Sequence, residues 1–257
     1  MIKLKNENAT VGIEAGELVS FLVSGHEFIH QKGSPGWRSS DTEMFPIIGP
    51  TNEAGFRVQV PKGNAIQDQH GLLRELAYEL QSQTKDSAVF AKQYEAGTPI
   101  KNSKFPNKST EQELIWPYSF RFEKSFFLNG ETLEITFTIS GEKGMPFMLG
   151  YHPAFKLYSD TPTIIANQQE ISLDEVLEVG SRALQVENCT SISLKDKKDI
   201  TIKTKGFGNF MCWTEVRNMI CIEPISFYPY VVNQKDLHLG FQHLGNDEAV
   251  FKVKLSV

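Results

Sequence analysis

The feature that most constrains the fold of this chain is a strict alternation of apolar and polar side chains over residues 118–122 and again over residues 132–139. The alternation runs on both sides of an Asn129-Gly130 pair. Residues that alternate in this way lie on opposite faces of a β-strand, one towards the core and the other towards water. Asn-Gly readily adopts the positive φ angles of a tight turn, so the segment predicts a long β-hairpin.

Shorter runs of the same kind predict further strands. Clusters of Gly, Pro, Asn and Asp separate them, and no segment keeps a 3.6-residue apolar period over several turns. Many short strands with few short helices are typical of a large antiparallel β-sandwich, an all-β fold. The polar segment 98–110, with two prolines, is expected to be a surface loop. The further strands are expected at residues 10–13, 18–23, 56–60, 88–94, 147–149, 200–204, 211–216, 219–223 and 251–257.

Composition limits the class of protein. The 257 residues are 40% hydrophobic and carry a net charge of −5, which suits a single folded domain over 1–257. No segment concentrates Lys and Arg, so a nucleic-acid partner is not expected. The apolar runs are far shorter than the roughly 20 residues that span a bilayer, and the polar start predicts no secretory signal. Three cysteines without C-x-x-C spacing predict reduced thiols and a cytoplasmic protein.

His26-Glu27-Phe28-Ile29-His30 matches H-E-x-x-H, the zinc protease motif, which needs both histidines on one helical turn. The segment follows an alternating strand and runs into a Gly- and Pro-rich stretch, which disfavours a helix. On a strand the two histidines would lie about 13 Å apart, too far to share one ion. We therefore expect a hairpin with Phe28 in the core, both histidines facing outward, and no metal.

Three other segments join ionisable groups to restricted backbones. His70 and Arg74 flank a glycine, and His152 and Glu223 each stand directly before a proline, which favours an extended conformation. Glu223 also ends an apolar run, where a buried carboxylate is costly without a partner. Taken singly, each residue is more often structural than functional.

The order of these segments resembles the aldose 1-epimerase (galactose mutarotase) family, in particular its shorter bacterial members. The similarity runs along nearly the whole chain, and its most specific parts are His152-Pro153-Ala154-Phe155 and Cys221-Ile222-Glu223-Pro224. Either part alone is a weak signal, but together at this spacing they are a strong one. The other matching segments are Glu17-Leu18-Val19-Ser20, Gly25-His26-Glu27-Phe28, Trp37, Met44-Phe45-Pro46-Ile47-Ile48-Gly49, His70-Gly71 with Arg74, Trp116-Pro117-Tyr118 and Met145-Pro146-Phe147.

The resemblance implies a supersandwich of the galactose mutarotase type and an isomerase that interconverts the α and β anomers of a hexose without a cofactor. Glu223 would be the base that takes the proton of the C1 hydroxyl, and His152 the acid on the ring oxygen. His70 would bind near the ring oxygen or O1 and help to polarise it. We expect these groups to face each other across one sugar-sized cleft in a monomer or homodimer.

Sugar binding also needs donors for hydroxyls and an apolar platform. Arg74 is expected to donate, and Trp213 or Phe45 to stack, although large rings in a sandwich usually fill the core. Two positions depart from the family pattern: Pro50 stands where an arginine is common and Ile225 where a tryptophan is common. Hydroxyl contacts should therefore differ, and Arg38 is expected to replace one of them.

Three alternatives stay open. A hexose 6-phosphate would need several converging cations, and Arg74, Arg38 and Lys62 are the visible candidates, so an unphosphorylated sugar is favoured. A non-catalytic carbohydrate-binding or sensing protein would not need both His152 and Glu223. A zinc hydrolase is the least favoured.

Overall fold

The computed structural model describes all of residues 1–257. Nine strands form its largest sheet, and every neighbouring pair in it is antiparallel. In sheet order these are β18 (Gln169–Ser172), β17 (Thr163–Ala166), β20 (Ser191–Lys195), β21 (Ile200–Lys205), β25 (Ala249–Ser256), β13 (Thr132–Gly141), β12 (Phe120–Asn129), β9 (Ser87–Tyr94) and β8 (Glu79–Gln83).

The predicted long hairpin is confirmed near the middle of this sheet. Strands β12 and β13 pair from Phe120–Gly141 to Asn129–Thr132. Gly130, in the two-residue turn, has a φ of 58°, a left-handed conformation that costs glycine little. Along both strands every second side chain is buried, as the alternation predicts.

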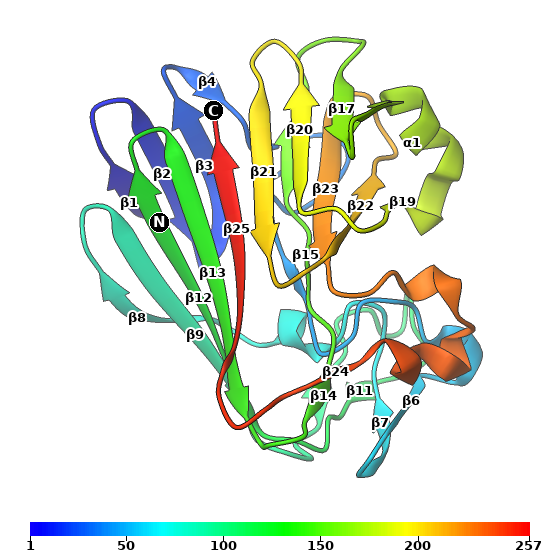
Figure 1. Cartoon of the computed structure of the whole chain (residues 1–257). Helices are drawn as coiled ribbons and strands as arrows, with labels where there is room; N and C mark the ends of the chain where they lie inside the picture. Colours follow the sequence, from blue (N-terminus) through cyan, green and yellow to red (C-terminus); the bar gives the residue numbers. More distant parts are fainter.

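A second sheet of six strands carries most of the candidate site. It comprises β19 (Leu184–Val186), β22 (Asn209–Trp213), β23 (Met219–Ile225), β15 (Gly150–Tyr151) and β5 (Glu43–Met44), with β16 (Ala154–Lys156) also paired to β23. Figure 1 shows β22 and β23 on the opposite side of the molecule from β8 and β9. All seven residues of β23 are buried, so Glu223 and Pro224 lie inside the strand, which continues two residues beyond its predicted end.

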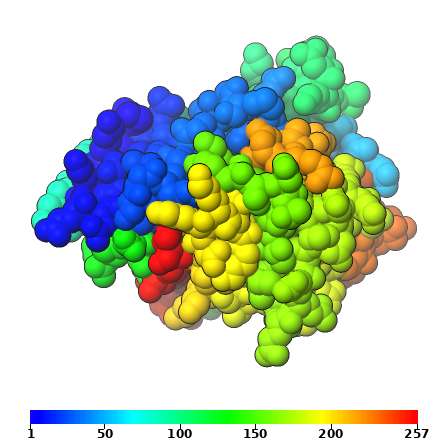
Figure 2. All heavy atoms as spheres, turned by 90° about the horizontal axis from the view of Figure 1, so that it is seen from above, coloured from blue at the N-terminus to red at the C-terminus, as the bar shows by residue number.

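The N-terminal strands form a third antiparallel sheet, and the remaining strands pair in twos. From above, the N-terminal strands (blue) and the segment around residues 160–190 (lime green) lie on opposite sides of the molecule (Figure 2). The third sheet contains β1 (Ile2–Lys5), β2 (Ala9–Glu14), β3 (Glu17–Val23) and β4 (His26–Glu27); the pairs are β6 (Arg57–Val60) with β7 (Gly63–Ile66), β10 (Ile100–Lys101) with β11 (Glu113–Leu114), and β14 (Pro146–Phe147) with β24 (Gln242–His243).

Helical structure is short, as predicted. The α-helix α1 (Leu173–Val179) begins with a capping box, in which Ser172 accepts from the Glu175 amide and the Glu175 side chain accepts from the Ser172 amide. No helix in the structure has the length and apolar character needed to cross a membrane. The 3₁₀ helices are η1 (Asn52–Ala54), η2 (Leu72–Glu75), η3 (Gly180–Arg182), η4 (Pro229–Val231) and η5 (Gln234–Gly240).

Most core side chains belong to one cluster of 53 buried residues, to which all three large sheets contribute. The prediction of a large antiparallel β-sandwich is therefore confirmed. Segment 98–110 lies mainly outside the strands, with the short β10 inside it, and Asn102 is buried. The strand predicted at 211–216 ends at Trp213, because the Thr214 hydroxyl turns the chain by bonding to the carbonyls of Val216 and Met219.

The H-E-x-x-H segment forms the expected hairpin, since Val23 pairs with His26 and Leu22 with Glu27. Phe28 fills the core, as predicted. The prediction that both histidines face outward is wrong for His30, which is buried and bonds through Nε2 to the Trp37 carbonyl at 2.9 Å. A strand that continues from β4 into the bridge at Ile29 turns His30 inward.

Candidate active site

A cavity of about 590 Å³ opens beside the six-stranded sheet, within the size range of small-molecule sites. Strands β22 and β23 and the segment around η2 all contribute to its lining. Five of the seven predicted site residues line it: His70, Arg74, His152, Trp213 and Glu223. The sheet thus brings together side chains that are up to 153 residues apart in the sequence.

Glu223 and His152 lie side by side on one wall of this cavity. The His152 Nε2 atom is 3.4 Å from Glu223 Oε1, and both side chains are almost fully buried. The His152 amide donates to the Thr42 carbonyl at 2.8 Å, and the ring stacks on Trp37 with centroids 4.2 Å apart and planes 7° apart. We expected the two groups to face each other across one sugar-sized cleft. They instead lie next to each other and face the same part of the cavity.

Burial moves the pKa values of the two groups in opposite directions. It raises the pKa of Glu223 to about 8, a rise that the Arg74 guanidinium limits. It lowers the pKa of His152 well below the usual value, and Arg74 lowers it further. Each shift favours the neutral form, as burial does for any ionisable group. Both shifts thus favour a pair in which the titratable proton resides on Glu223 and the His152 ring is neutral.

His70 enters the cavity from a strained turn. Its φ is 75°, rare for a residue with a side chain, and Gly71 follows at 73°. A Cβ atom on Gly71 would lie 2.2 Å from the Phe45 carbonyl oxygen, so the turn needs glycine there. Non-glycine residues in this region are typical of sites where the surrounding structure imposes the conformation.

The hydrogen bond of His70 determines its chemistry. Nδ1 lies 2.8 Å from the Ile48 carbonyl oxygen, which can only accept, so Nδ1 carries the proton. Burial lowers the pKa of His70 well below its usual value, with Arg74 and His152 adding to the effect. The neutral ring then offers only a lone pair at Nε2. It can accept from a sugar hydroxyl, but it cannot polarise a ring oxygen, which has no hydrogen to donate.

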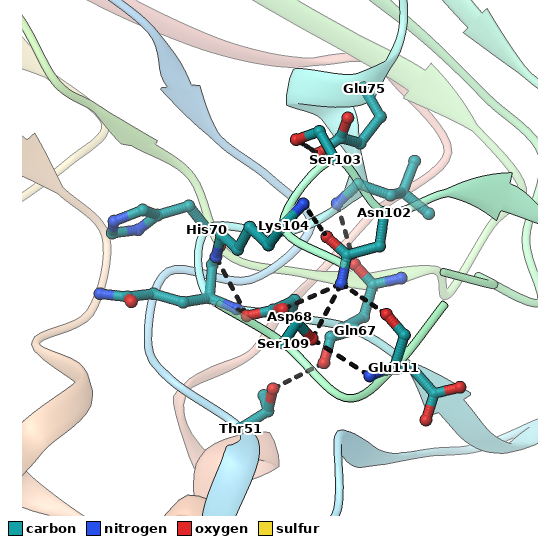
Figure 3. A network of polar contacts seen from close by, with 12 residues as sticks. Thr51, Gln67, Asp68, His70, Glu75, Asn102, Ser103, Lys104, Ser109 and Glu111 are labelled. Atoms are coloured by element: carbon teal, nitrogen blue, oxygen red, sulfur yellow. Dashed lines mark hydrogen bonds and ion pairs between the residues drawn. The ribbon is translucent and has the colours of Figure 1, made fainter. Parts of the chain in front are cut away.

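A polar network supports the turn that carries His70 (Figure 3). Lys104 Nζ donates to Asp68 Oδ1 at 3.0 Å and to the Gln69 carbonyl at 2.8 Å. The buried Asn102 amide donates to Asp68 Oδ2 at 3.0 Å. In Figure 3 the His70 ring points away from this network. Segment 98–110 therefore forms part of the site, because it fixes the backbone on either side of Asp68.

Arg74, on η2, also lines the cavity. Its Nε donates to the Glu43 carbonyl at 2.8 Å, and its guanidinium carbon lies 5.5 Å from the centre of the Trp37 ring. Burial lowers the pKa of Arg74 to about 10, against the opposing charges of Glu223 and Glu43, so it stays charged at neutral pH. Its buried Nη2 atom has no partner in the protein, which suits a donor for a ligand hydroxyl.

The structure does not bring the other two predicted residues into the cavity. Phe45 has no exposed surface and packs edge-on against Phe120, so its ring cannot stack on a ligand. Arg38 is exposed and does not line the cavity. Trp213 lines it as expected, partly exposed and beside Trp37.

Several lining residues were missed by sequence reasoning. Trp37 was noted only as part of the resemblance, although it contacts both His152 and Arg74. Its isolation in a Gly- and Pro-rich segment was the one available signal. Met211 lies on β22 beside Trp213. The others belong to loops and short helices with no pattern of their own: Asn52, Phe56, Asp68, Gln69, Lys104, Lys108, Ser181, Arg182, Ala183, Glu215 and Tyr230.

Comparison with known proteins agrees with this picture. Residues 16–223 match a family model described as aldose 1-epimerase. The plasmid-encoded protein LacX of Lactococcus lactis subsp. lactis is 29% identical over 274 residues, which cover 88% of this chain and 87% of LacX.

Two solved structures are similar along their whole length. A galactose mutarotase-like protein from Lactobacillus casei ATCC 334 superimposes with a TM-score of 0.78 at 18% identity, covering 99% of each chain. A galactose mutarotase related enzyme from Lactobacillus acidophilus gives 0.76 at 20% identity, covering 100% of this chain and 97% of that one. At these identities the likeness shows a common fold.

Proposed function

This chain belongs to the aldose 1-epimerase family, and we propose that it interconverts the α and β anomers of a hexose by acid–base opening and closure of the sugar ring. The observation that carries the proposal is the separation of 3.4 Å between His152 Nε2 and Glu223 Oε1 at the wall of one cavity. O1 and the ring oxygen O5 of an aldose are both bonded to C1. Groups that serve these two oxygens must therefore lie close together, as this pair does.

In the proposed reaction one group of the pair takes the proton of the O1 hydroxyl while the other gives a proton to O5. The O1–H electrons form the carbonyl bond at C1, and the C1–O5 bond breaks towards O5. Rotation about C1–C2 turns the other face of the aldehyde to O5, and the same steps run in reverse. Each positioned transfer contributes roughly 10²–10⁴ in rate. Side chains make both transfers, so the proposed reaction uses no cofactor.

The acid is whichever residue holds the proton of the pair when the sugar binds. The pKa directions favour Glu223 as its holder, and we therefore propose that Glu223 protonates O5 and His152 accepts from O1. The family pattern gives the opposite assignment, with Glu223 as base. Both contain the same number of protons, and because ring closure reverses the roles, each residue acts as acid and base in a full cycle.

The remaining residues hold the sugar. His70 accepts from a hydroxyl at Nε2, and Arg74 donates through the free Nη2 atom. Trp213 provides an apolar edge beside the pair, since its ring centroid lies 5.9 Å from that of His152. The site thus offers a donor, an acceptor and an aromatic surface, which is what a pyranose requires.

Optical rotation tests the proposal. Freshly dissolved α-glucose and α-galactose should reach equilibrium faster with the protein, and Glu223→Gln and His152→Asn should each lose at least about 100-fold of that activity. Glu223→Gln keeps the size of its side chain, and His152→Asn replaces the ring with a smaller polar group. The surface variant Glu131→Gln is the control. No acceleration with any aldose would favour a non-catalytic sugar-binding protein, and wild-type rates in both variants would remove the assigned pair.

A phosphorylated hexose is a second candidate substrate, because the cavity is lined by cationic side chains that sequence reasoning did not identify. Arg38 and Lys62 lie outside the lining, but Lys104, Lys108 and Arg182 are part of it. Lys104 is engaged by Asp68, whereas Lys108 and Arg182 are exposed and unpaired with any carboxylate. Two such cations in the lining suit a phosphate group on the sugar.

The two substrates can be separated by exchange NMR of glucose and glucose 6-phosphate anomers. A phosphate site predicts a higher kcat/KM for the phosphorylated sugar, and a loss of that advantage in Lys108→Ala and Arg182→Ala. Lys62→Ala, whose amine pairs with Glu142 outside the cavity, should change neither rate. Equal rates for both sugars in all variants would leave the free hexose as substrate.

A further inference from the structure

One buried thiol lies next to the proposed acid–base pair and has no part in the mechanism. Cys221 and Glu223 are two residues apart on β23, so their side chains share one face of the sheet. Ala154 pairs with Cys221 across the sheet, which places His152 beside them. Potential ligand atoms of His152, Cys221 and Glu223 all lie within 4.8 Å of one another, and all three residues are buried.

We propose that His152, Cys221 and Glu223 form a binding site for a thiophilic divalent cation, with Zn²⁺ as the best fit, that enters through the cavity. The site differs from the H-E-x-x-H motif, whose His30 is engaged by the Trp37 carbonyl and whose His26 packs against Tyr158.

The geometry is close to that of a three-ligand zinc centre. Zinc binds nitrogen and oxygen at about 2.0–2.2 Å and sulfur at about 2.3 Å, so tetrahedral ligands lie roughly 3.3–3.8 Å apart. The 3.4 Å between His152 Nε2 and Glu223 Oε1 already falls in that range. The Cys221 sulfur lies within 4.8 Å of the other two ligand atoms, so a small movement of these side chains is needed to bring all three to that spacing. His152 and Glu223 both line the cavity, which gives the ion a way in.

The ligand set selects against hard ions. A thiolate, an imidazole and one carboxylate suit Zn²⁺, Co²⁺ or Cd²⁺, whereas Mg²⁺ and Ca²⁺ require mainly oxygen. Binding replaces the Cys221 thiol proton by a metal–sulfur bond and releases that proton, and Glu223 gives up its own in the same way. The two resulting negative charges balance the cation. Since both ligands must lose a proton to bind the ion, the affinity should increase with pH.

A bound metal ion occupies the same lone pairs of His152 and Glu223 that accept protons in the proposed reaction. If the proposed function holds, the ion is therefore an inhibitor: Zn²⁺ stops anomer exchange, a chelator restores it, and Mg²⁺ has no effect. The existence of the site rests on the positions of the three ligands and not on the reaction.

Metal binding is measured without reference to activity, by titrating metal-free protein with Co²⁺. One ion per chain should bind with the intense thiolate-to-metal absorption of a cobalt–sulfur bond. Zn²⁺ should abolish the absorption and compete with a chromogenic chelator for one equivalent. Cys221→Ala should lose the absorption and weaken Zn²⁺ binding by more than about tenfold, because even outer-shell changes cost 10–100-fold.

Cys212→Ala is the matched control. Its thiol is also free and buried, on the neighbouring strand, but it lies outside the cluster. A wild-type protein without the thiolate absorption, or Cys221→Ala binding Zn²⁺ like wild type, would overturn the proposal even if anomer exchange is observed. Conversely, the absorption in a protein without anomer exchange would support the metal site and contradict the proposed function.

Discussion

At the scale of single residues, the site depends on a proton shared by two buried side chains. Glu223 and His152 are both shifted towards their neutral forms, and Arg74 influences both, since its positive charge lowers the pKa of each. When the pH lies between the lowered pKa of His152 and the raised pKa of Glu223, the pair holds one titratable proton. Below this window both groups are protonated, and above it neither is, so either extreme leaves the reaction without a base or without an acid.

We therefore predict a bell-shaped pH profile of kcat/KM for anomer exchange. The basic limb should fall near pH 8, as Glu223 loses its proton, and the acidic limb should lie below pH 6.5, as His152 gains one. Polarimetry between about pH 5 and pH 10, corrected for spontaneous exchange, measures both limbs. Activity that stays constant beyond about pH 9.5 would be incompatible with the shared proton.

Replacing Arg74 should move the whole profile. Without its charge both pKa values rise, so in Arg74→Met both limbs of the bell shift to higher pH, and KM increases because a hydroxyl donor is lost. Lys108→Met removes a cation from the same cavity at a position that does not affect either pKa, and it should leave the limbs unchanged. An unshifted profile in Arg74→Met would mean that the limbs report other groups.

Sequence reasoning could find Glu223 because it ends an apolar run before a proline, and His152 because it stands before a proline in a segment that resembles the aldose 1-epimerase family. It could not predict the tautomer of His70, which depends on a carbonyl contributed by residue 48. Nor could it separate Trp213 from Phe45: both are large rings in or next to short strands, and only the assembled sheets decide which of them faces the cavity.

At the scale of elements, the central hairpin carries a charge on its core face. Lys124 of β12 has no exposed surface, and its amine lies 2.8 Å from Asp41 and 2.7 Å from Glu43. Asp41 also accepts from the Tyr151 hydroxyl at 2.6 Å. Tyr151 belongs to β15, directly before His152, so this buried ion cluster ties the largest sheet to the strand that presents the histidine.

Lys124→Met should destabilise the protein by about 3–5 kcal/mol, because two carboxylates remain buried without their cation. Urea unfolding followed by circular dichroism gives the value. The control is Lys252→Met, whose amine pairs with Glu134 on the exposed face of the same sheet and should cost less than about 1 kcal/mol. Combining Lys124→Met with Asp41→Asn and Glu43→Gln should recover part of the loss. A single substitution as mild as the control would contradict this role.

Alternation could predict the strands of this hairpin and the direction of each side chain, including Lys124. The partners of Lys124 could not be predicted, since Asp41 lies 83 residues earlier in the chain. The alternation of apolar and polar residues describes one strand, and it gives no information about which loop packs on that strand. The same limit applied to Asn102, whose burial arises from contacts with Asp68 and Ser109.

At the scale of the whole molecule, the three large sheets share one core cluster, and no composition shift divides the sequence. We propose that the chain folds as one domain. Trp116 reports on this core, whereas Trp37 and Trp213 report on the cavity. Fluorescence and circular dichroism should therefore give coincident unfolding curves in urea. A fluorescence transition that precedes the loss of strand signal would show that the site unfolds separately.

The placement of the acid–base pair on one wall separates the residues that would transfer protons from the other residues that line the cavity. In the proposed reaction, proton transfer takes place at the anomeric edge of the sugar alone, at residues held by the strands of the sandwich. Segment 98–110 and η3 contribute Lys104, Lys108 and Arg182 to the lining of the same cavity. If the proposed function holds, changes in these surface segments can alter which sugar fits while the acid–base pair stays the same.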